Sequence, residues 1–129
     1  MIYLDSCALV KLTRPEPETP ALRSWLAARS RPAVSSALAM LEVTRAVRRS
    51  DPAALPRVSD VLSRVMLVPV EQSILASAAA LTDPLLRSLD AIHLATALRL
   101  DVPSLVLVTY DKRLSAAASQ EGLAVAAPG

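Results

Sequence analysis

The apolar residues of this chain fall into short runs whose spacing alternates between that of a strand and that of a helix. Brief runs rich in Val, Leu and Ile predict strands at residues 2–4, 32–36, 66–70, 105–109 and, as an edge strand, 123–126. Apolar positions three and four residues apart predict helices between them, at residues 6–12, 22–26, 36–49, 56–65, 71–81, 89–100 and 112–120.

Strands that alternate with helices favour βαβ units, which build a mostly parallel sheet covered by helices. We therefore predict an α/β fold, a three-layer α/β/α sandwich around a mostly parallel sheet of four to five strands. A chain of 129 residues is long enough for one core and too short for two. The chain has no repeats or linkers, so we expect a single domain from residue 1 to residue 129.

Polar residues at the predicted helix boundaries have the character of capping residues. Ser6, Ser36 and Ser88 precede the first apolar positions of three helices, where a hydroxyl can accept a backbone hydrogen bond. Gly122 follows the last predicted helix, at the position where a left-handed residue ends many helices.

The composition narrows the environment of the protein. Apolar residues make up 53% of the chain, yet no apolar run approaches the roughly 20 residues that a membrane helix needs. This excess suggests an apolar surface shared with a partner. Asp5 and Lys11 interrupt the first apolar segment, which therefore does not resemble a signal peptide, and we expect a cytoplasmic protein. The only cysteine, Cys7, excludes an internal disulfide, and the net charge of +2 neither demands nor excludes nucleic acid.

Acidic residues stand where ligands bind in parallel sheets. Asp5 directly follows the first predicted strand, and Asp111 lies two residues beyond the strand at 105–109. The carboxyl ends of parallel strands share one edge of the sheet, and ligands bind there. Asp90 opens a helix that is apolar on almost every side, where an unpaired charge is costly, and Glu42 lies in the helix after the second strand.

If these acids converge, their repulsion decides the chemistry. Two unit charges about 4 Å apart interact by roughly 4 kcal/mol at an effective dielectric near 20. The carboxylates could stay ionised only beside a cation, and otherwise some of their pKa values would rise sharply. Hard oxygen ligands without a cysteine or histidine cluster favour Mg²⁺ or Mn²⁺.

Each acid also has a purely structural interpretation. Asp5 could cap the first helix, Asp90 could be a first-turn acid that favours the helix dipole, and Asp111 could belong to a turn. A phosphatase or phosphoacceptor domain would also use an aspartate such as Asp5. Such a phosphatase would have a second aspartate two positions on, where this chain has Cys7.

Helical periodicity gives Glu42 an ordinary place on the surface. It falls on the same side of its helix as Arg45 and Arg49, which predicts a solvated face with an ion pair between Glu42 and Arg45. By the same reasoning His93, one turn after Asp90, is expected to be a core residue with its hydrogen bonds satisfied, and Cys7 a small buried residue.

Four segments in order resemble the PIN-domain family, and specifically the VapC-type ribonuclease toxins of prokaryotic toxin–antitoxin pairs. These segments are IYLDS at 2–6, SSALAMLEV at 35–43, SLDAIHLATA at 88–97 and VLVTYDKRL at 106–114. The resemblance implies an acidic pocket, and all four acids of the family pattern are present in this chain. Its catalytic residues would be Asp5, Glu42, Asp90 and Asp111.

The resemblance also implies a role for each residue. Asp5 and Asp90 would bind the metal, while Glu42 and Asp111 would hold metal-bound water or a second ion. Small hydroxyl residues, Ser6 and Thr109, would support the pocket, and two arginines, Arg45 and Arg49, would contact RNA phosphate.

The implied activity is that of an Mg²⁺-dependent endoribonuclease, with Mn²⁺ able to substitute, in which metal-activated water hydrolyses RNA phosphodiester bonds. The implied partners are RNA, a cognate VapB-like antitoxin and a second copy of the chain, in a homodimer or a toxin–antitoxin hetero-oligomer without a membrane. The alternative is a non-catalytic PIN-like protein-interaction module. Lost acids would indicate such a module, and none of the four acids is lost.

Overall fold

Five parallel strands form the centre of the computed structural model, which describes residues 1–129. Their order across the sheet is β3-β2-β1-β4-β5. The strands are β1 (Ile2–Leu4), β2 (Ala33–Ser36), β3 (Met66–Val68), β4 (Val106–Val108) and β5 (Ala124–Ala126). The predicted parallel sheet is confirmed, with all five strands present.

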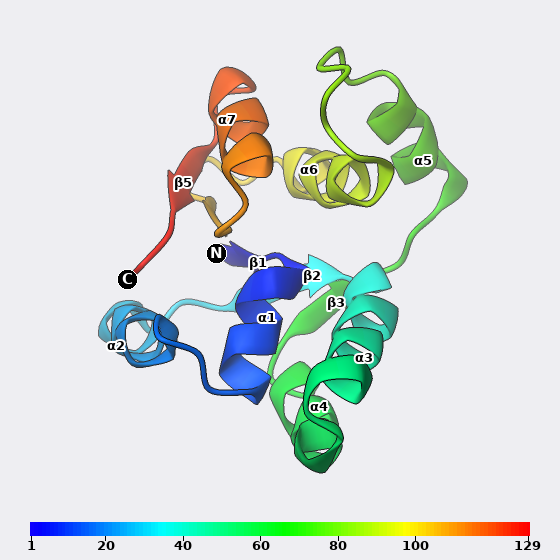
Figure 1. Ribbon diagram of the computed structural model, residues 1–129. Helices are drawn as coiled ribbons and strands as arrows, with labels where there is room; N and C mark the ends of the chain where they lie inside the picture. The colour runs from blue at the N-terminus through cyan, green and yellow to red at the C-terminus, as the bar shows by residue number, and fades with distance from the viewer.

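Helices cover both faces of this sheet, as the three-layer prediction requires. In Figure 1, α1 to α4 lie below the sheet and α5 to α7 above it. The helices are α1 (Ser6–Thr13), α2 (Thr19–Arg29), α3 (Leu38–Ser50), α4 (Leu55–Leu62), α5 (Gln72–Ala79), α6 (Ser88–Leu100) and α7 (Lys112–Gln120), with a 3-10 turn, η1 (Pro52–Ala54), before α4. None of them is long and apolar enough to span a membrane.

The central strand, β1, separates two cores because its side chains alternate between the two faces. Ile2 and Leu4 pack among residues of α1, α3 and α4 on one face. Tyr3 points to the opposite face and packs with Leu94 of α6 and Leu114 of α7. Both cores consist mainly of Leu, Val and Ala, as a chain without Phe requires.

The order in which successive strands are added to the sheet switches sides at β1. The chain runs outward from β1 to β2 and β3, and then crosses back to place β4 on the other side of β1. Leu4 of β1 is in register with Val108 of β4, so the residues that follow them, Asp5 and Thr109, leave the sheet side by side. Such a switch point is where open α/β sheets bind ligands.

The first helix is capped by a different residue from the one predicted. The carboxylate of Asp5 accepts a hydrogen bond from the backbone N–H of Ala8 at 2.9 Å, and Ser6 is the first residue of α1. The capping interpretation of Asp5 is therefore correct as far as it goes. The prediction that Ser6 is the cap is wrong, because Ser6 is already the first residue of α1. Its hydroxyl donates a hydrogen bond to Glu42 of α3.

The other helix boundaries agree with the sequence in part. The Ser36 hydroxyl accepts a hydrogen bond from the backbone N–H of Leu38 at 3.1 Å, but Ala37, not Ser36, occupies the capping position of α3. Gly122 follows α7 with φ +89°, as predicted. Ser88 does not cap α6, because it already belongs to the first turn and Arg87 occupies the capping position.

Candidate active site

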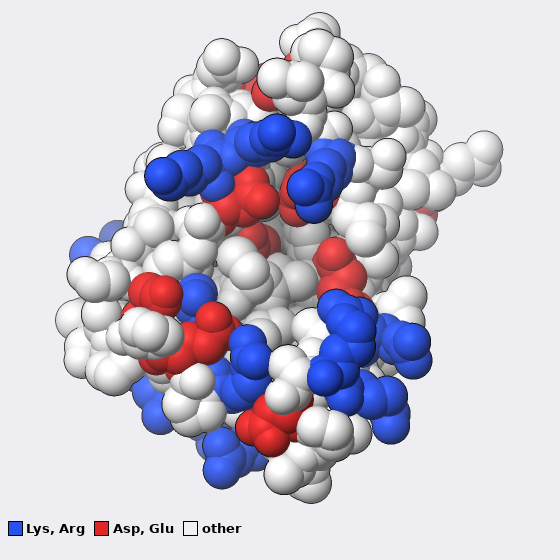
Figure 2. Space-filling view, viewed as in Figure 1, with Lys and Arg blue, Asp and Glu red and all other residues white.

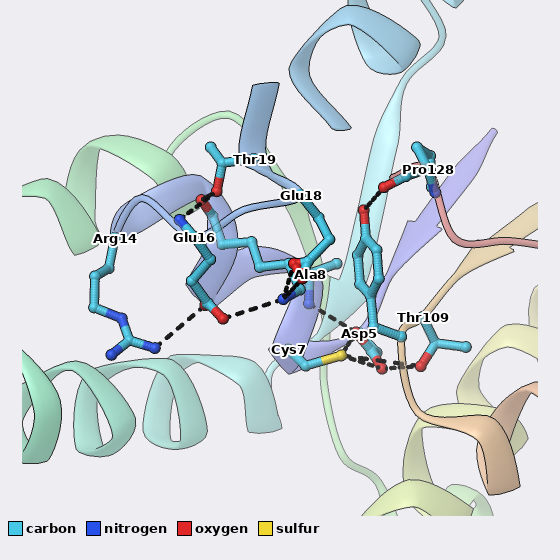
Figure 3. A network of polar contacts seen from close by, with 11 residues as sticks. Asp5, Cys7, Ala8, Arg14, Glu16, Glu18, Thr19, Thr109 and Pro128 are labelled. Carbon is cyan, nitrogen blue, oxygen red and sulfur yellow. Dashed lines mark hydrogen bonds and ion pairs between the residues drawn. The ribbon is translucent and has the colours of Figure 1, made fainter. Parts of the chain in front are cut away.

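Asp5 is buried at the switch point and is held by several donors (Figure 3). Besides the N–H of Ala8, its carboxylate accepts a short hydrogen bond from the hydroxyl of Thr109 and one from the thiol of Cys7, with sulfur and oxygen 3.0 Å apart. These donors come from α1 and from the end of β4. Together they fix the orientation of the carboxylate relative to both strands.

Thr109 links Asp5 to the next acid along the sheet edge. Its hydroxyl oxygen accepts a hydrogen bond from the backbone N–H of Asp111 at 3.1 Å while its proton is donated to Asp5. The carboxylate of Asp111 in turn accepts from the N–H of Leu114 at 2.9 Å and caps α7. Asp111 therefore has a structural role at the helix end as well as a place beside Asp5.

Asp90, in the first turn of α6, has no hydrogen-bond donor or ion-pair partner within the protein. Burial, followed by the negative charges of Asp111 and Asp5, raises its pKa above the usual carboxyl value. The charge of Glu42 acts in the same direction. The fold thus brings the three other acids within electrostatic range of Asp90.

A space-filling view of this face shows acidic atoms inside a central hollow with basic side chains along its borders (Figure 2). No three of the His, Cys, Asp and Glu side chains lie in an arrangement that would hold one metal ion among them. Two carboxylates with water molecules suffice for Mg²⁺, which keeps several waters when it binds proteins. The unpartnered carboxylate of Asp90 and the neighbouring Asp5 fit such an ion.

Glu42 points into the protein, contrary to the prediction from helical periodicity. Its Oε1 atom accepts a hydrogen bond from the hydroxyl of Ser6 and lies 2.7 Å from Nε2 of His93. Burial alone would raise the pKa of Glu42, but the contacts with His93 and Ser6 outweigh burial and lower it. No ion pair joins Glu42 to Arg45, because the Glu42 carboxylate contacts Ser6 of α1 and His93 of α6 instead.

Cys7 is only half-buried and lies against the site. Burial and the charge of Asp5 raise the pKa of its thiol to about 12. The thiol therefore remains protonated at neutral pH and donates to Asp5. The prediction of a small buried residue is wrong, because Cys7 is partly exposed and lines a groove beside the acids.

That groove, of about 490 Å³, runs between α1 and α3 from Glu42 toward two arginines. Arg49 of α3 lines it, as expected for a residue near the pocket, whereas Arg45 is exposed and does not. Arg14, which the sequence analysis did not single out, lines the opposite wall and pairs with Glu16 at 3.3 Å. Its position depends on the Pro-rich loop after α1, which no periodicity describes.

His93 was expected to be a satisfied core residue, and it is buried with partners on both ring nitrogens. One of these partners is Glu42, so the histidine also belongs to the surroundings of the acids. The sequence carries one signal for this, since His93 lies one helical turn from Asp90 on α6. It contains no signal for the other partner, Tyr3, because that contact joins residues far apart along the chain.

The parallel α/β sheet, with Asp5 and Asp111 beyond the ends of its neighbouring strands β1 and β4, agrees with the resemblance of the sequence to PIN domains. The sequence model of the PIN domain matches residues 2–120, and the chain belongs to this family. Among curated proteins, it is 48% identical to Ribonuclease VapC35 of Mycobacterium tuberculosis strain H37Rv, over 100% of this chain and 98% of the relative. It is also 48% identical to Ribonuclease VapC46 of the same strain, over 98% of this chain and 97% of the relative.

Solved structures confirm the three-layer fold. The chain superposes on VapBC2 from Rickettsia felis, bound to a promoter DNA fragment, with a TM-score of 0.77 at 15% identity and full coverage of both chains. It superposes on VapC20 of Mycobacterium tuberculosis, described as a sarcin–ricin loop cleaving toxin, with a TM-score of 0.76 at 15% identity. That match covers 91% of this chain and 95% of the other.

Proposed function

We propose that the chain is an Mg²⁺-dependent endoribonuclease and the toxin of a toxin–antitoxin pair. The observation that carries this proposal is the unpartnered carboxyl of Asp90, whose pKa is raised by burial and by the charges of Asp111, Asp5 and Glu42. A cation offsets that concentration of charge, and the ribonucleases to which the chain is related at 48% identity suggest what the cation is used for.

Asp5 and Asp90 would hold the ion, with Glu42 and Asp111 around it. When bound, a divalent ion lowers the pKa of a water molecule and neutralises charge on a phosphate group. The chain's own contribution is orientation, because Thr109 and the N–H of Ala8 fix the carboxylate of Asp5. Ser6 supports the neighbouring acid, Glu42.

Glu42 is suited to accept a hydrogen bond from water. Its lowered pKa keeps it ionised at neutral pH, and both of its hydrogen bonds go to Oε1. The second oxygen, Oε2, has no partner within the protein and is free for a ligand in the groove. Asp111, fixed by its contact with α7, would act from the opposite side of Asp5.

The antitoxin and a second copy of the chain would cover apolar surface that the fold leaves open. Six large apolar side chains are exposed, namely Met40, Leu41, Met66, Leu75, Leu85 and Leu89. Leu89 also lines the groove beside Glu42, so a partner seated there would close access to the site. Structural neighbours that are toxin–antitoxin complexes, from Klebsiella pneumoniae and Rickettsia felis, support such an assembly.

RNA cleavage by the purified protein should require a divalent ion. We expect cleavage of structured cellular RNA with Mg²⁺, a loss of at least about 100-fold with EDTA, and recovery with Mn²⁺. Gel analysis of end-labelled RNA measures all three. Cleavage that survives EDTA would contradict the metal dependence, and a chain that neither binds Mn²⁺ nor cuts RNA would be an interaction module instead.

Arg49→Ala should weaken RNA binding by about 3- to 10-fold and reduce the slope of log affinity against log salt by about one, as expected for one screened phosphate contact. Fluorescence anisotropy with a labelled RNA in EDTA measures both values without cleavage. Arg48→Ala is the matched control, because Arg48 neighbours Arg49 on α3 and is exposed but does not line the groove. Equal effects of the two substitutions on RNA binding would contradict a specific phosphate contact by Arg49.

A further inference from the structure

A chain of hydrogen bonds runs through the interior from the central strand to the acidic pocket. The phenol oxygen of Tyr3, in β1, lies 2.7 Å from Nδ1 of His93, in α6. The other ring nitrogen, Nε2, lies 2.7 Å from Oε1 of Glu42, in α3. Tyr3 and His93 are 0% and 1% exposed, so water does not compete for these contacts.

The positions of the protons in this chain follow from its two ends. Oε1 of Glu42 already accepts the hydroxyl proton of Ser6, and an ionised carboxylate only accepts hydrogen bonds. Nε2 of His93 must therefore carry a proton and donate it to Oε1. At the other end, the buried phenol of Tyr3 is a hydroxyl that can donate to Nδ1.

The phenol oxygen of Tyr3 lies 2.7 Å from Nδ1 of His93, and the hydroxyls of Ser35 and Thr96 also contact it. A phenol that donates to Nδ1 makes His93 a neutral imidazole with its proton on Nε2. A doubly protonated ring would donate from both nitrogens, so the phenol proton would have to turn away from the ring toward another acceptor. The neutral Nε2–H form leaves every donor and acceptor of the chain satisfied.

From this geometry we propose that Tyr3 and His93 position Glu42 for RNA hydrolysis, with Tyr3 selecting the His93 tautomer and His93 holding Oε1. This inference rests on the proposed ribonuclease function. His93 is a positioning residue here, because it touches Glu42 and lies 1% exposed behind it. Ser6 strengthens the arrangement, since its hydroxyl donates to the same Oε1 and lies 3.0 Å from Nε2.

Two donors on one carboxylate oxygen restrict its rotation more than a single donor would. Oε2 is consequently presented to the groove in one orientation, between Ser6 and Cys7 on one wall and Arg49 on the other. Loss of His93 would leave Ser6 as the only anchor. Substrate binding in the groove would continue, but the carboxylate would spend less time in its working position.

The tautomer can be read directly, because His93 is the only histidine in the chain. Long-range ¹H–¹⁵N NMR of the metal-free protein should show the neutral Nε2–H form, with Nδ1 shifted by hydrogen bonding. Tyr3→Phe removes only the hydroxyl and should shift the Nδ1 resonance toward that of an unbonded nitrogen or yield a mixture of tautomers. A wild-type ring protonated on Nδ1, or a spectrum unchanged by Tyr3→Phe, would contradict the proposal that Tyr3 selects the His93 tautomer.

Kinetics separate positioning from simple packing. His93→Leu should lower kcat for RNA cleavage by about 10- to 100-fold with little change in KM, the range seen when a supporting group behind an active-site ligand is lost. His93→Gln should recover most of this loss, because its amide nitrogen can reach Oε1. Wild-type kcat in His93→Leu, or an equal loss in both variants, would contradict the inference.

Separate controls distinguish a failure to fold from a failure of the proposed function. Circular dichroism shows whether each variant folds, and Tyr3→Phe, with a threefold to tenfold lower kcat expected, decides the matter if His93→Leu does not. If the wild-type protein cuts no RNA, the proposed function fails while the NMR spectra still decide the tautomer and its dependence on Tyr3. If the wild-type protein cuts RNA and the variants match it, only the positioning role fails.

Discussion

Asp90→Asn is expected to abolish RNA cleavage and, in the absence of metal, to make the protein more stable. The raised pKa of Asp90 means that its ionised form is disfavoured in the folded protein relative to the unfolded chain. Above that pKa the charge therefore lowers the free energy of unfolding, and a neutral amide removes this effect. Because Asp90 is only half-buried, we expect a modest gain, a rise in Tm of roughly 1–4 °C in EDTA.

With Mg²⁺ the wild-type protein should have a higher Tm than Asp90→Asn, the reverse of the order expected in EDTA. An ion that binds only the folded state raises Tm by mass action, so the wild-type protein gains stability with Mg²⁺ while Asp90→Asn gains little. Calorimetry in EDTA and in Mg²⁺ measures the reversal, and the RNA assay should show at least about a 100-fold loss. Asp60→Asn, at an exposed ion pair of α4, is the matched control. An equal response of Asp90→Asn to Mg²⁺ would remove Asp90 from the metal site.

Asp5→Ala and Asp5→Asn should differ in how much stability they lose but should reduce RNA cleavage to a similar extent. Asp5→Ala removes the cap of α1, worth about 1 kcal/mol, and leaves the buried hydroxyl of Thr109 without its acceptor, at about 1–3 kcal/mol. Less repulsion on Asp90 offsets part of this loss. We expect a net decrease of about 2 kcal/mol in the free energy of unfolding, measured with urea.

Asp5→Asn keeps an oxygen for the N–H of Ala8 and should lose less than half as much stability as Asp5→Ala. Both variants should nevertheless cut RNA at least about 100-fold more slowly, because an amide is a poor ligand for Mg²⁺ beside a carboxylate. Activity that follows stability would point to a purely structural role for Asp5. Full cleavage by Asp5→Asn would exclude it from the catalytic residues.

The arrangement of strands and helices could be predicted closely, because each element carries its own local signal. The run of β-branched and aliphatic residues that forms β4 is bounded by polar residues, and Gly122 supplies the left-handed conformation after α7. The ends of elements were less predictable. Strand β3 stops at Val68, two residues early, because Pro69 has no N–H to continue the ladder.

For the site, the sequence by itself determined which acids end strands. Asp5 follows β1 and Asp111 lies just beyond β4, and parallel neighbours bring the ends of such strands together. The pattern did not determine the environment of Glu42. Helical periodicity shows which residues share a face of α3, but it does not show that Ser6 of α1 and His93 of α6 lie within hydrogen-bond distance of Glu42.

Only the tertiary structure placed Tyr3, His93 and Arg14 around the acids. Tyr3 and His93 are 90 residues apart, and their contact depends on how α6 lies across β1. Arg14, directly after α1, lines the groove and pairs with Glu16 of the following loop. Local patterns record the preferences of a segment for itself, whereas contacts between distant segments arise from packing, and these contacts decide how the acids are oriented and supported.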